Sequence, residues 1–573
     1  MGGAASIPRF ERAFAGLGYD LATLLRRLDE TGERDELSAA GLRRAWAECV
    51  RDARRGRGPT RFGCYIHIPF CRQRCAYCRH FQARLESPAQ LERYLGVLDD
   101  AFAYYSPAFR GVRFGNLIVG GGTPGILEAE ALEHLLRRLF AAFAFDESPG
   151  DRAFEFNPAG VTAGKLRVLA RYGFRRVSMG VQSMSARVLD AQNRGYQTGN
   201  VLDRAFALVR DSGIAQLCVD LIAGLAGDDT TGFRESFAAL ARRKPDQITV
   251  YPLVPTTLYL RQRFGGDFGA FLARRREFLA EVVPWMHAHA GHHGYRSERE
   301  RDGPGDNAWV FNRCGVRRLA AEDEEFYDDT SSVPASIFGL GPGAGSSIWG
   351  RLVCTDRGPI PGRFDPRERR YWATRRDRRD EMARFVLMNM RKHGEVRRDQ
   401  FRRSFGTDLV DEYPVAVARL ASLGLARLDP GRLRLRSGTG KRRFLCAVPF
   451  LDRKVLQRAL RGGADGTAPF VRVSSRTCAA EFAVEHALPD VAYLRVLKGL
   501  GLRLLYAGEQ QTPSARSLAG RATMLRLAQR AFAAAVRASR HREPAAVARV
   551  LHARLRRAAA RLGLLCRLAR PVG

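Results

Sequence analysis

Apolar residues along the middle of the chain follow two alternating spacings. Short apolar runs of strand length occur at six places, and between them apolar residues recur every three or four positions. The runs are Cys64–Pro69, Asn116–Val119, Ala153–Phe156, Val177–Val181, Leu217–Ile222 and Gln247–Tyr251. Six strand–helix units in a row predict an α/β fold with a parallel sheet, open or curled into a partial barrel. In such folds the chemistry collects at the C-terminal ends of the strands.

The two ends of the chain have different patterns, and they divide it into four expected parts. Residues 1–60 are expected to form a helical, basic leader that ends in a linker at Arg51–Thr60. Residues 61–380 would hold the partial barrel and an extension with a long helix at Phe271–His287. Residues 381–437 end in a hairpin at Leu425–Leu435 and predict a small winged-helix-like domain. Residues 438–573 are expected to form a basic, mainly helical extension of unknown role.

Length and cysteine content restrict the class of protein. The chain has 573 residues, of which 45% are hydrophobic, so it can bury a sizeable core. It shows no apolar run long enough to span a membrane and no secretory signal pattern, so we expect a cytoplasmic protein. Its eleven cysteines are too few and scattered for a disulfide framework, yet three of them are clustered. In a reducing compartment such a cluster favours a metal or cofactor site.

The formal net charge of +34 invites a nucleic-acid interpretation. We consider nucleic acid an unlikely partner, because arginine is spread over the whole chain and a charged face is usually only solvated. Ligands that carry carboxylates are an alternative partner for this charge.

The clustered cysteines lie in the segment Tyr65–Cys78, directly after the first predicted strand. Cys71, Cys75 and Cys78 are separated by three and then two residues, so their thiolates can hold one cluster from a single loop. Four irons with three local ligands leave one iron open to a substrate or cofactor. A structural zinc site with a distant fourth ligand is the alternative interpretation.

This loop resembles that of radical S-adenosylmethionine (SAM) enzymes. Its flanking Tyr65, His67, Pro69 and Phe70 are similar to those of the HemN-like branch, named for oxygen-independent coproporphyrinogen III oxidase. The resemblance runs from about residue 61 to 255 and weakens to about residue 437. It implies a partial (β/α)6 radical SAM barrel and a [4Fe–4S] cluster on the three cysteines. It also implies cleavage of SAM to a 5′-deoxyadenosyl radical, with a donor such as flavodoxin or ferredoxin supplying the electron.

The resemblance further implies a set of SAM-binding residues, each at a predicted strand end. Residues 120–124 match the family's glycine segment, whose backbone meets the amino group of SAM, and glycine permits such close approach. Arg194 follows Asn193 as in the family and would reach the SAM carboxylate, a role that suits a guanidinium. Asp220 would lie near the ribose and Tyr77 beside the adenine. The full expected set is Tyr65, Tyr77, Gly121, Gly122, Thr123, Glu155, Gln182, Arg194 and Asp220.

Departures from the family leave the reaction open. Arg79, His80 and Phe81 stand where coproporphyrinogen oxidases carry a further cysteine, which argues against simple decarboxylation of propionates. Gly345 replaces a histidine that many relatives have in a later glycine-rich turn, here Gly339–Gly345. The run Cys75–Gln82 is closer to the haem-utilisation branch, which resembles radical SAM methyltransferases.

Two classes of function therefore remain. In the first, the protein is an enzyme that uses one or two SAM molecules for oxidation or methyl transfer on a tetrapyrrole such as haem. Its residues would position the substrate and exclude water, while the cofactor supplies the chemistry. In the second, it is a non-catalytic haem chaperone that retains the cluster, and His67, His80 or His287 would serve as a haem ligand.

Overall fold

The computed structural model describes two compact units, one within residues 32–377 and the other beginning at residue 378. Each unit is treated by itself. The first 33 residues and nearly all of the predicted C-terminal extension lie outside the described residues. The described residues are 34–80, 82–147, 152–297, 308–316, 333–356, 358–360, 362–422, 425–436, 446 and 450.

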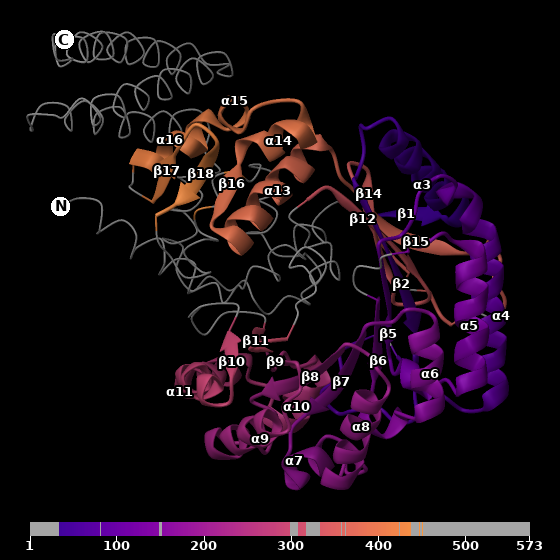
Figure 1. Ribbon diagram of the computed structural model, residues 1–573, viewed down its shortest axis with the longest axis vertical. Helices are drawn as coiled ribbons and strands as arrows, with labels where there is room; N and C mark the ends of the chain where they lie inside the picture. The colour runs from indigo at the N-terminus through magenta and orange to yellow at the C-terminus, as the bar shows by residue number, and fades with distance from the viewer. Residues whose placement is uncertain are drawn as a thin grey trace, which may run out of the picture. The chain divides into compact units, whose positions relative to one another are not determined.

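Six parallel strands form the centre of the large unit, in the order in which they occur along the chain (Figure 1). All six were predicted from the apolar runs. They are β2 (Arg61–Ile68), β5 (Asn116–Gly121), β6 (Arg152–Phe156), β7 (Arg176–Gln182), β8 (Gln216–Ala223) and β9 (Gln247–Pro252). Because neighbouring strands are parallel, their C-terminal ends meet at one edge of the sheet.

Helices connect these strands and cover one face of the sheet. Most of these helices begin with a side-chain cap. In α4, for example, Ser87 precedes Pro88 and accepts a hydrogen bond from the Gln90 N–H. The connecting helices are α4 (Pro88–Tyr105), α5 (Ala129–Ala142), α6 (Ala163–Arg171), α7 (Ala186–Ala191), α8 (Gly199–Asp211) and α9 (Thr230–Arg242). The large unit therefore has the predicted α/β class, with parallel strands connected by helices.

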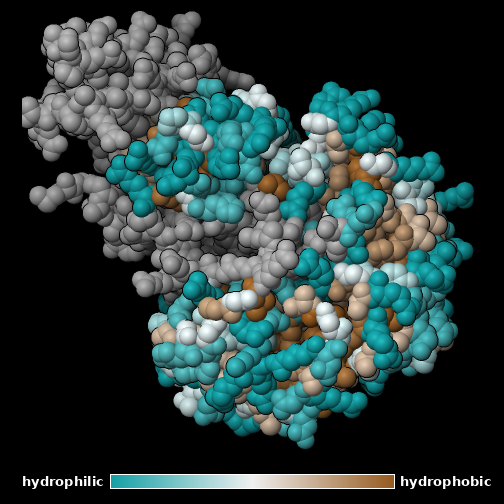
Figure 2. Space-filling model, in the orientation of Figure 1, coloured by the Kyte–Doolittle hydropathy of each residue, from teal (hydrophilic) through white to brown (hydrophobic). Residues whose placement is uncertain are grey.

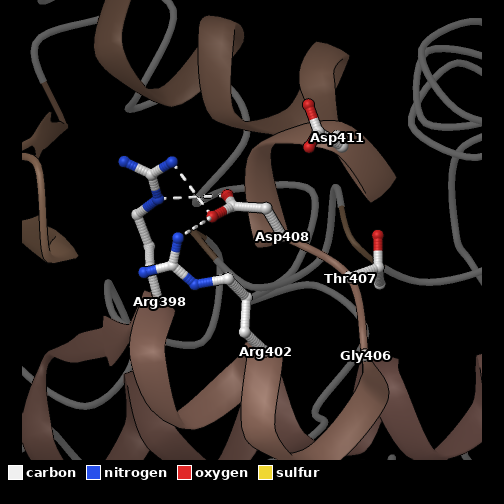
Figure 3. A pocket seen from close by; sticks show the side chains of 6 residues that line it. All are labelled: Arg398, Arg402, Gly406, Thr407, Asp408 and Asp411. Atoms are coloured by element: carbon white, nitrogen blue, oxygen red, sulfur yellow. Dashed lines mark hydrogen bonds and ion pairs between the residues drawn. The ribbon is translucent and has the colours of Figure 1, made fainter.

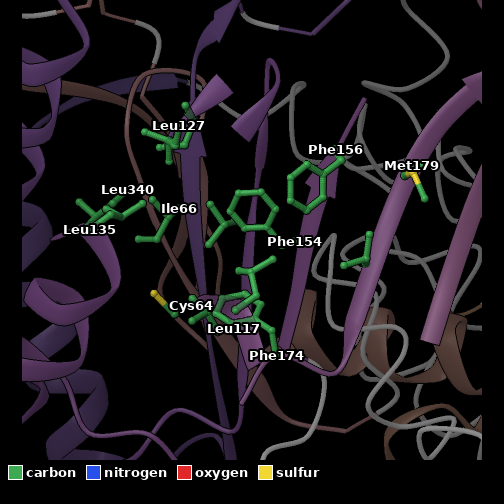
Figure 4. Close-up of a cluster of buried hydrophobic side chains, with 14 of the residues drawn as sticks. Cys64, Ile66, Leu117, Leu127, Leu135, Phe154, Phe156, Phe174, Met179 and Leu340 are labelled. Atoms are coloured by element: carbon green, nitrogen blue, oxygen red, sulfur yellow. The ribbon is translucent and has the colours of Figure 1, made fainter. Parts of the chain in front are cut away.

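Alternation along each strand separates the core from the site. One set of side chains, such as Ile66, Leu117 and Phe154, packs with helix residues such as Leu135 in a continuous buried cluster (Figure 4). The other set is largely polar and includes Tyr65, Glu155, Ser178, Asp220 and Thr249. These polar residues face the side of the sheet away from the helices.

Further strands extend the sheet at both ends, which the sequence did not predict. β12 (Ala335–Leu340) pairs in parallel with β2, and antiparallel strands continue beyond it. These are β13 (Gly345–Ile348), β14 (Leu352–Thr355), β15 (Arg370–Arg375) and β1 (Arg34–Ser38). Beyond β9 lie β11 (Trp309–Arg313) and β10 (Tyr295–Ser297), preceded by α10 (Thr257–Phe264) and α11 (Phe268–His292). The predicted helix at Phe271–His287 is thus the middle of α11.

The described residues before 60 contain the expected helix, but they pack with the large unit. β1 pairs with β15, and α3 (Ala39–Arg54) begins at an N-cap made by Ser38. The segment expected to be a linker starts inside α3. Trp46 in α3 is fully buried in the same core as β2, so these residues belong to the large unit. The pairing is with strands more than 300 residues away, which local spacing cannot indicate.

The small unit has the predicted winged-helix order of elements. Its three-stranded sheet has the order β16, β18, β17, and the hairpin predicted at Leu425–Leu435 is β17 and β18. The elements are α13 (Arg378–His393), β16 (Glu395–Arg397), α14 (Arg398–Phe405), α15 (Leu409–Glu412), α16 (Pro414–Ser422), β17 (Ala426–Leu428) and β18 (Arg432–Leu435).

The surface seen in Figure 2 is dominated by polar and charged residues, with apolar ones in small groups between them. Among the described residues, no helix combines the length and the apolar character needed to cross a membrane.

Candidate cofactor site at the strand ends

The loop that carries the three clustered cysteines, residues 69–78, is tied to the backbone on both sides. On one side, the Gly122 N–H donates to the Ile68 carbonyl at 2.8 Å, and the Thr123 N–H donates to the Phe70 carbonyl at 2.9 Å. On the other side, the Asn193 side-chain amide donates to the Arg74 carbonyl at 3.1 Å. We call this segment the cluster loop. It is fixed between the end of β5 and the turn that follows α7.

The cluster loop brings the three thiols within electrostatic reach of one another. Burial is the main cause that raises the pKa of Cys71 and of Cys78, and the nearby thiols raise both further because thiolates repel each other. A hydrogen bond between Cys71 Sγ and Thr123 Oγ1, at 3.3 Å, acts in the opposite direction. Three thiols held this way need positive charge nearby before they can all ionise.

Arg194 supplies such a charge. Its side chain is 5% exposed, and Nη1 donates to Cys75 Sγ at 3.5 Å. It also lowers the pKa of Cys71 and Cys78 from its position among the thiols. Nη2 donates to the Gly180 carbonyl at 2.5 Å and to Gln197 Oε1 at 2.7 Å. The guanidinium therefore links the cluster loop to the end of β7.

The glycine segment after β5, residues 120–125, is shaped by close contacts; we call it the glycine loop. Gly121 has φ +120°, a conformation that favours glycine, and an added Cβ would lie 2.9 Å from the His67 ring. A Cβ on Gly122 would lie 2.8 Å from the Phe70 carbonyl oxygen. Thr123 follows and contacts Cys71. The backbone of the glycine loop thus reaches the cluster loop only because side chains are absent.

The carboxyl groups of Glu155 and Asp220 lie on the inner side of the sheet, where the charge of Glu155 acts on Asp220. Glu155 accepts a hydrogen bond from the Gly121 N–H at 3.2 Å. Burial first, and then the charge of Glu155, raise the pKa of Asp220 to about 7, while Arg176 acts in the opposite direction. An acid whose pKa is shifted this far, beside a specific charge partner, is typical of a functional site.

Gln182 closes β7 in a strained conformation. Its φ is +70°, and the pairing of β7 with β8 shifts register between Gly180 and Gln182. Its side chain folds across Gly180, and its buried Oε1 has no hydrogen-bond partner in the described residues. A buried acceptor left unpaired at a strand end suits a ligand that donates a hydrogen bond.

Two tyrosines of the expected set lie on either side of this region. Tyr65 is on the inner side of β2, and its hydroxyl is 3.0 Å from His67 Nδ1. Tyr77 packs with Ile222, at the end of β8, against a small apolar cluster. Most of the twelve expected residues lie near the C-terminal ends of β2, β5, β6, β7 and β8 or in the cluster loop, and Arg194 lies in the turn after α7.

These residues fit a cluster and SAM by the chemistry of their donors. Three thiols on one loop are the ligand type that iron–sulfur clusters use, and a buried guanidinium lies beside them. The buried Gln182 Oε1 and the partly buried backbone of the glycine loop suit a polar ligand beside the cluster. Within the described ranges, no three His, Cys, Asp or Glu side chains are arranged to hold a single metal ion.

Sequence reasoning missed the residues that hold these groups in place. Gln197 accepts from Arg194 and donates to the Val181 carbonyl at 2.7 Å. Lys165 in α6 is 3% exposed, and its Nζ donates to the Gly125 carbonyl at 3.0 Å, inside the glycine loop. It also pairs with Glu128 at 3.2 Å. The three-residue spacing of Gln197 from Arg194 was the only available signal.

The three histidines considered as haem ligands do not lie together. His67 is buried beneath Gly121 and contacts Tyr65. His80 is exposed just after the cluster loop, and His287 lies in α11 with its ring 5.5 Å from that of Phe311.

An open hollow of about 630 Å³ lies in the small unit and is lined by Arg398, Arg402 and Asp408 among others (Figure 3). Arg398 makes two hydrogen bonds of 3.0 Å to Asp408, and Arg402 lies 3.4 Å from the same carboxylate. Both arginines of this hollow are paired with Asp408, and this pairing stabilises the small unit.

Comparison with known proteins matches two parts of the chain. Residues 65–240 match the radical SAM superfamily, and residues 377–437 match the HemN C-terminal domain. The oxygen-independent coproporphyrinogen III oxidase of Paracoccus denitrificans is 31% identical over 33% of this chain and 41% of its own length. The Escherichia coli enzyme is 29% identical over 39% and 49%. The chain thus spans less than half of these two oxidases.

A second kind of relative aligns over a longer stretch. The heme chaperone HemW of Bacillus subtilis is 24% identical over 63% of this chain and 91% of its own length. The solved structure of coproporphyrinogen III oxidase (HemN) from E. coli is similar in fold, with a TM-score of 0.57. It is 21% identical and covers 71% of this chain and 93% of its own. Over these matched residues the chain is similar to the HemN-like branch of the radical SAM superfamily.

Proposed function

We propose that Cys71, Cys75 and Cys78 hold a [4Fe–4S] cluster and that the surrounding strand ends bind SAM for radical chemistry on a tetrapyrrole. The observation that carries this proposal is the meeting of three thiols, a buried guanidinium and a glycine-shaped backbone at one sheet edge. When bound, the cluster and SAM supply a 5′-deoxyadenosyl radical. The relatives named above act on coproporphyrinogen or handle heme, which supports a tetrapyrrole ligand.

Each group of residues has a role in this proposal. Arg194 neutralises the thiolates and pairs with the SAM carboxylate, and carbonyl oxygens of the glycine loop accept from the amino group. Glu155 and Gln182 would accept hydrogen bonds from SAM. Asp220, which takes up a proton near neutral pH, would hydrogen-bond the ribose. Tyr77 would pack beside the adenine and exclude water from it.

Substitution of the ligands tests the cluster. We expect that the C71A/C75A/C78A variant, reconstituted anaerobically with iron and sulfide, lacks the brown absorbance of the wild-type protein. Cys314→Ala, which removes an exposed thiol outside the cluster loop, is the control and should keep the absorbance. Retention of full absorbance in the triple variant would place the ligands elsewhere.

Product analysis tests the reaction class. The reconstituted protein is incubated with SAM and dithionite, with haem or coproporphyrinogen present. 5′-Deoxyadenosine together with S-adenosylhomocysteine, formed only with haem, would indicate radical methyl transfer. 5′-Deoxyadenosine alone, with coproporphyrinogen, would indicate oxidation.

The second candidate is a haem chaperone that retains the cluster. The alignment with 91% of the B. subtilis chaperone favours it. Transfer of haem to an acceptor protein, without formation of 5′-deoxyadenosine, would support the chaperone and contradict the enzyme.

A further inference from the structure

The C-terminal end of α11 is rich in histidine. Of the eleven histidines in the chain, four lie within the seven residues from His287 to His293. His289 is in the last turn of the helix, and His293 is its C-cap. Residues four apart on a helix lie on the same face, so these two rings are neighbours. None of these residues belongs to the cofactor site described above.

The two rings meet nitrogen to nitrogen. Nε2 of His289 lies 3.2 Å from Nε2 of His293, with the ring centroids 4.9 Å apart. Zn²⁺ binds histidine nitrogen at about 2.0–2.1 Å in tetrahedral geometry, so two such ligands are roughly 3.3 Å apart. The observed separation of 3.2 Å is close to that distance. A simple hydrogen bond between the two imidazoles is the alternative explanation.

The surroundings fix the ring of His289. It stacks on Trp285 with centroids 4.4 Å apart and an angle of 17° between the planes. Trp285 in turn contacts Phe237, whose side chain is fully buried in the core. A ligand whose ring is already oriented loses little freedom on binding. The rings of His289 and His293 are partly exposed, so an ion can reach them.

The charges near His289 and His293 have opposite effects on the binding of a cation. A helix C-terminus carries partial negative charge and favours a cation there. Arg242 is near enough to His289 to affect its charge and would oppose a cation. In the part of the chain that is described, no third His, Cys, Asp or Glu completes the site. We therefore expect moderate affinity, with water in the remaining positions.

We propose that His289 and His293 form a two-histidine chelate for a divalent transition-metal ion of the Zn²⁺ and Ni²⁺ class. Pairs of histidines at this spacing on a helix bind zinc in known metal sites. Here the bound ion would join the last turn of α11 to its C-cap. It would thereby fix the turn into β10, the outermost strand of the sheet.

Trp285 provides a direct readout of the ion. Ni²⁺ bound at His289 would lie close to the stacked indole and quench its fluorescence. The titration uses the full chain carrying C71A/C75A/C78A, so that the cluster-loop thiols do not compete for the ion. We expect saturable quenching by Ni²⁺ that excess Zn²⁺ reverses. Trp285→Phe should remove the quenching, while a chromophoric competitor for Ni²⁺ still reports binding.

Single substitutions identify the ligands. His289→Asn and His293→Asn should each weaken Ni²⁺ binding by at least about tenfold, since losing even an outer-shell partner of a metal costs roughly 10- to 100-fold. His292→Asn is the matched control, because it removes an exposed histidine from the same helix end. It should change the affinity less than either. Equal affinity in all three variants and the parent would overturn the proposal, as would the absence of binding to the parent.

Discussion

The ionised form of the Asp220 side chain is destabilised in the folded protein. Burial and the charge of Glu155 raise its pKa from 3.8 to about 7. Between these two values the folded protein holds a proton that the unfolded chain has released. The free energy of unfolding therefore falls as the pH rises through this window. Such a cost at a strand end is expected where a side chain serves a ligand and not the core.

We predict that Asp220→Asn stabilises the large unit at pH 8 but not at pH 4. The amide needs no proton, so the variant avoids the cost that the wild type bears above pH 7. We expect a gain of about 2 kcal/mol at pH 8, reduced from the full shift because the side chain is partly exposed. Urea unfolding at the two pH values measures it. Asp211→Asn, which removes an exposed carboxylate at the end of α8, is the control for the loss of one surface charge.

A gain at pH 8 that persisted unchanged at pH 4 would contradict this origin. The stabilisation would then come from packing and not from the proton on Asp220.

The functional residues at strand ends were predictable from the sequence, but the residues that hold them in place by hydrogen bonds were not. Cys71, Arg194 and Asp220 stand in local sequence patterns, so their positions followed from spacing and resemblance. Gln197 and Lys165 have no such pattern. Their importance lies in hydrogen bonds to backbone carbonyls of other segments, which only the folded chain brings near.

At the level of elements, α6 supports the glycine loop through one buried amine. Lys165 Nζ donates to the Gly125 carbonyl at 3.0 Å and to the Gly160 carbonyl at 3.3 Å. Its partner Glu128 lies 3.6 Å from Arg72 of the cluster loop, but both of those side chains are exposed, and so that pair contributes little. Lys165 is therefore the main link from α6 to the glycine loop.

We predict that Lys165→Met loosens the glycine loop. The buried Gly125 carbonyl and the partly buried Gly160 carbonyl lose their donor, and a buried acceptor left unpaired costs about 1–3 kcal/mol. Amide hydrogen exchange in residues 121–127, measured by mass spectrometry on the full chain, should become faster. If the glycine loop binds SAM as proposed, the affinity should fall roughly tenfold, which corresponds to about 1.4 kcal/mol, while iron content stays unchanged. Lys244→Met, at an exposed position, is the control.

Unchanged exchange in the Lys165→Met variant would show that the glycine loop is held by the cluster loop alone. A loss of iron would instead mean that Lys165 supports the cluster loop as well.

Element prediction succeeded where strands alternate with helices and failed at both ends of the sheet. The central strands carry closely spaced apolar residues that pack on the connecting helices, and each strand is followed by a helical spacing. β1, β13, β14 and β15 are short, with mixed polarity, and they pair in antiparallel fashion. Nothing local distinguishes such segments from loops, because their stability comes from partners distant in sequence.

At the scale of the whole large unit, α3, which precedes the first parallel strand, packs into the core. Trp46 in α3 is fully buried, with its ring 5.0 Å from Phe109 and 5.5 Å from Phe338 in β12. Arg351 forms ion pairs with Glu48 and Asp52 on the same helix. α3 thus joins residues from the beginning and the end of the unit, which a detached leader would not do.

We predict that Trp46→Ala destabilises the large unit by about 3–5 kcal/mol, because it leaves a cavity beside the rings of Phe109 and Phe338. Urea unfolding of the full chain should show the loss, and hydrogen exchange in β2 and β12 should accelerate together. Trp46→Phe keeps most of the buried ring and should cost less. Trp372→Ala is the matched control, because that side chain is 49% exposed and contributes little to the core. If Trp46→Ala changed stability no more than Trp372→Ala, α3 would be an appendage after all. The cofactor site would then rest on the parallel strands alone.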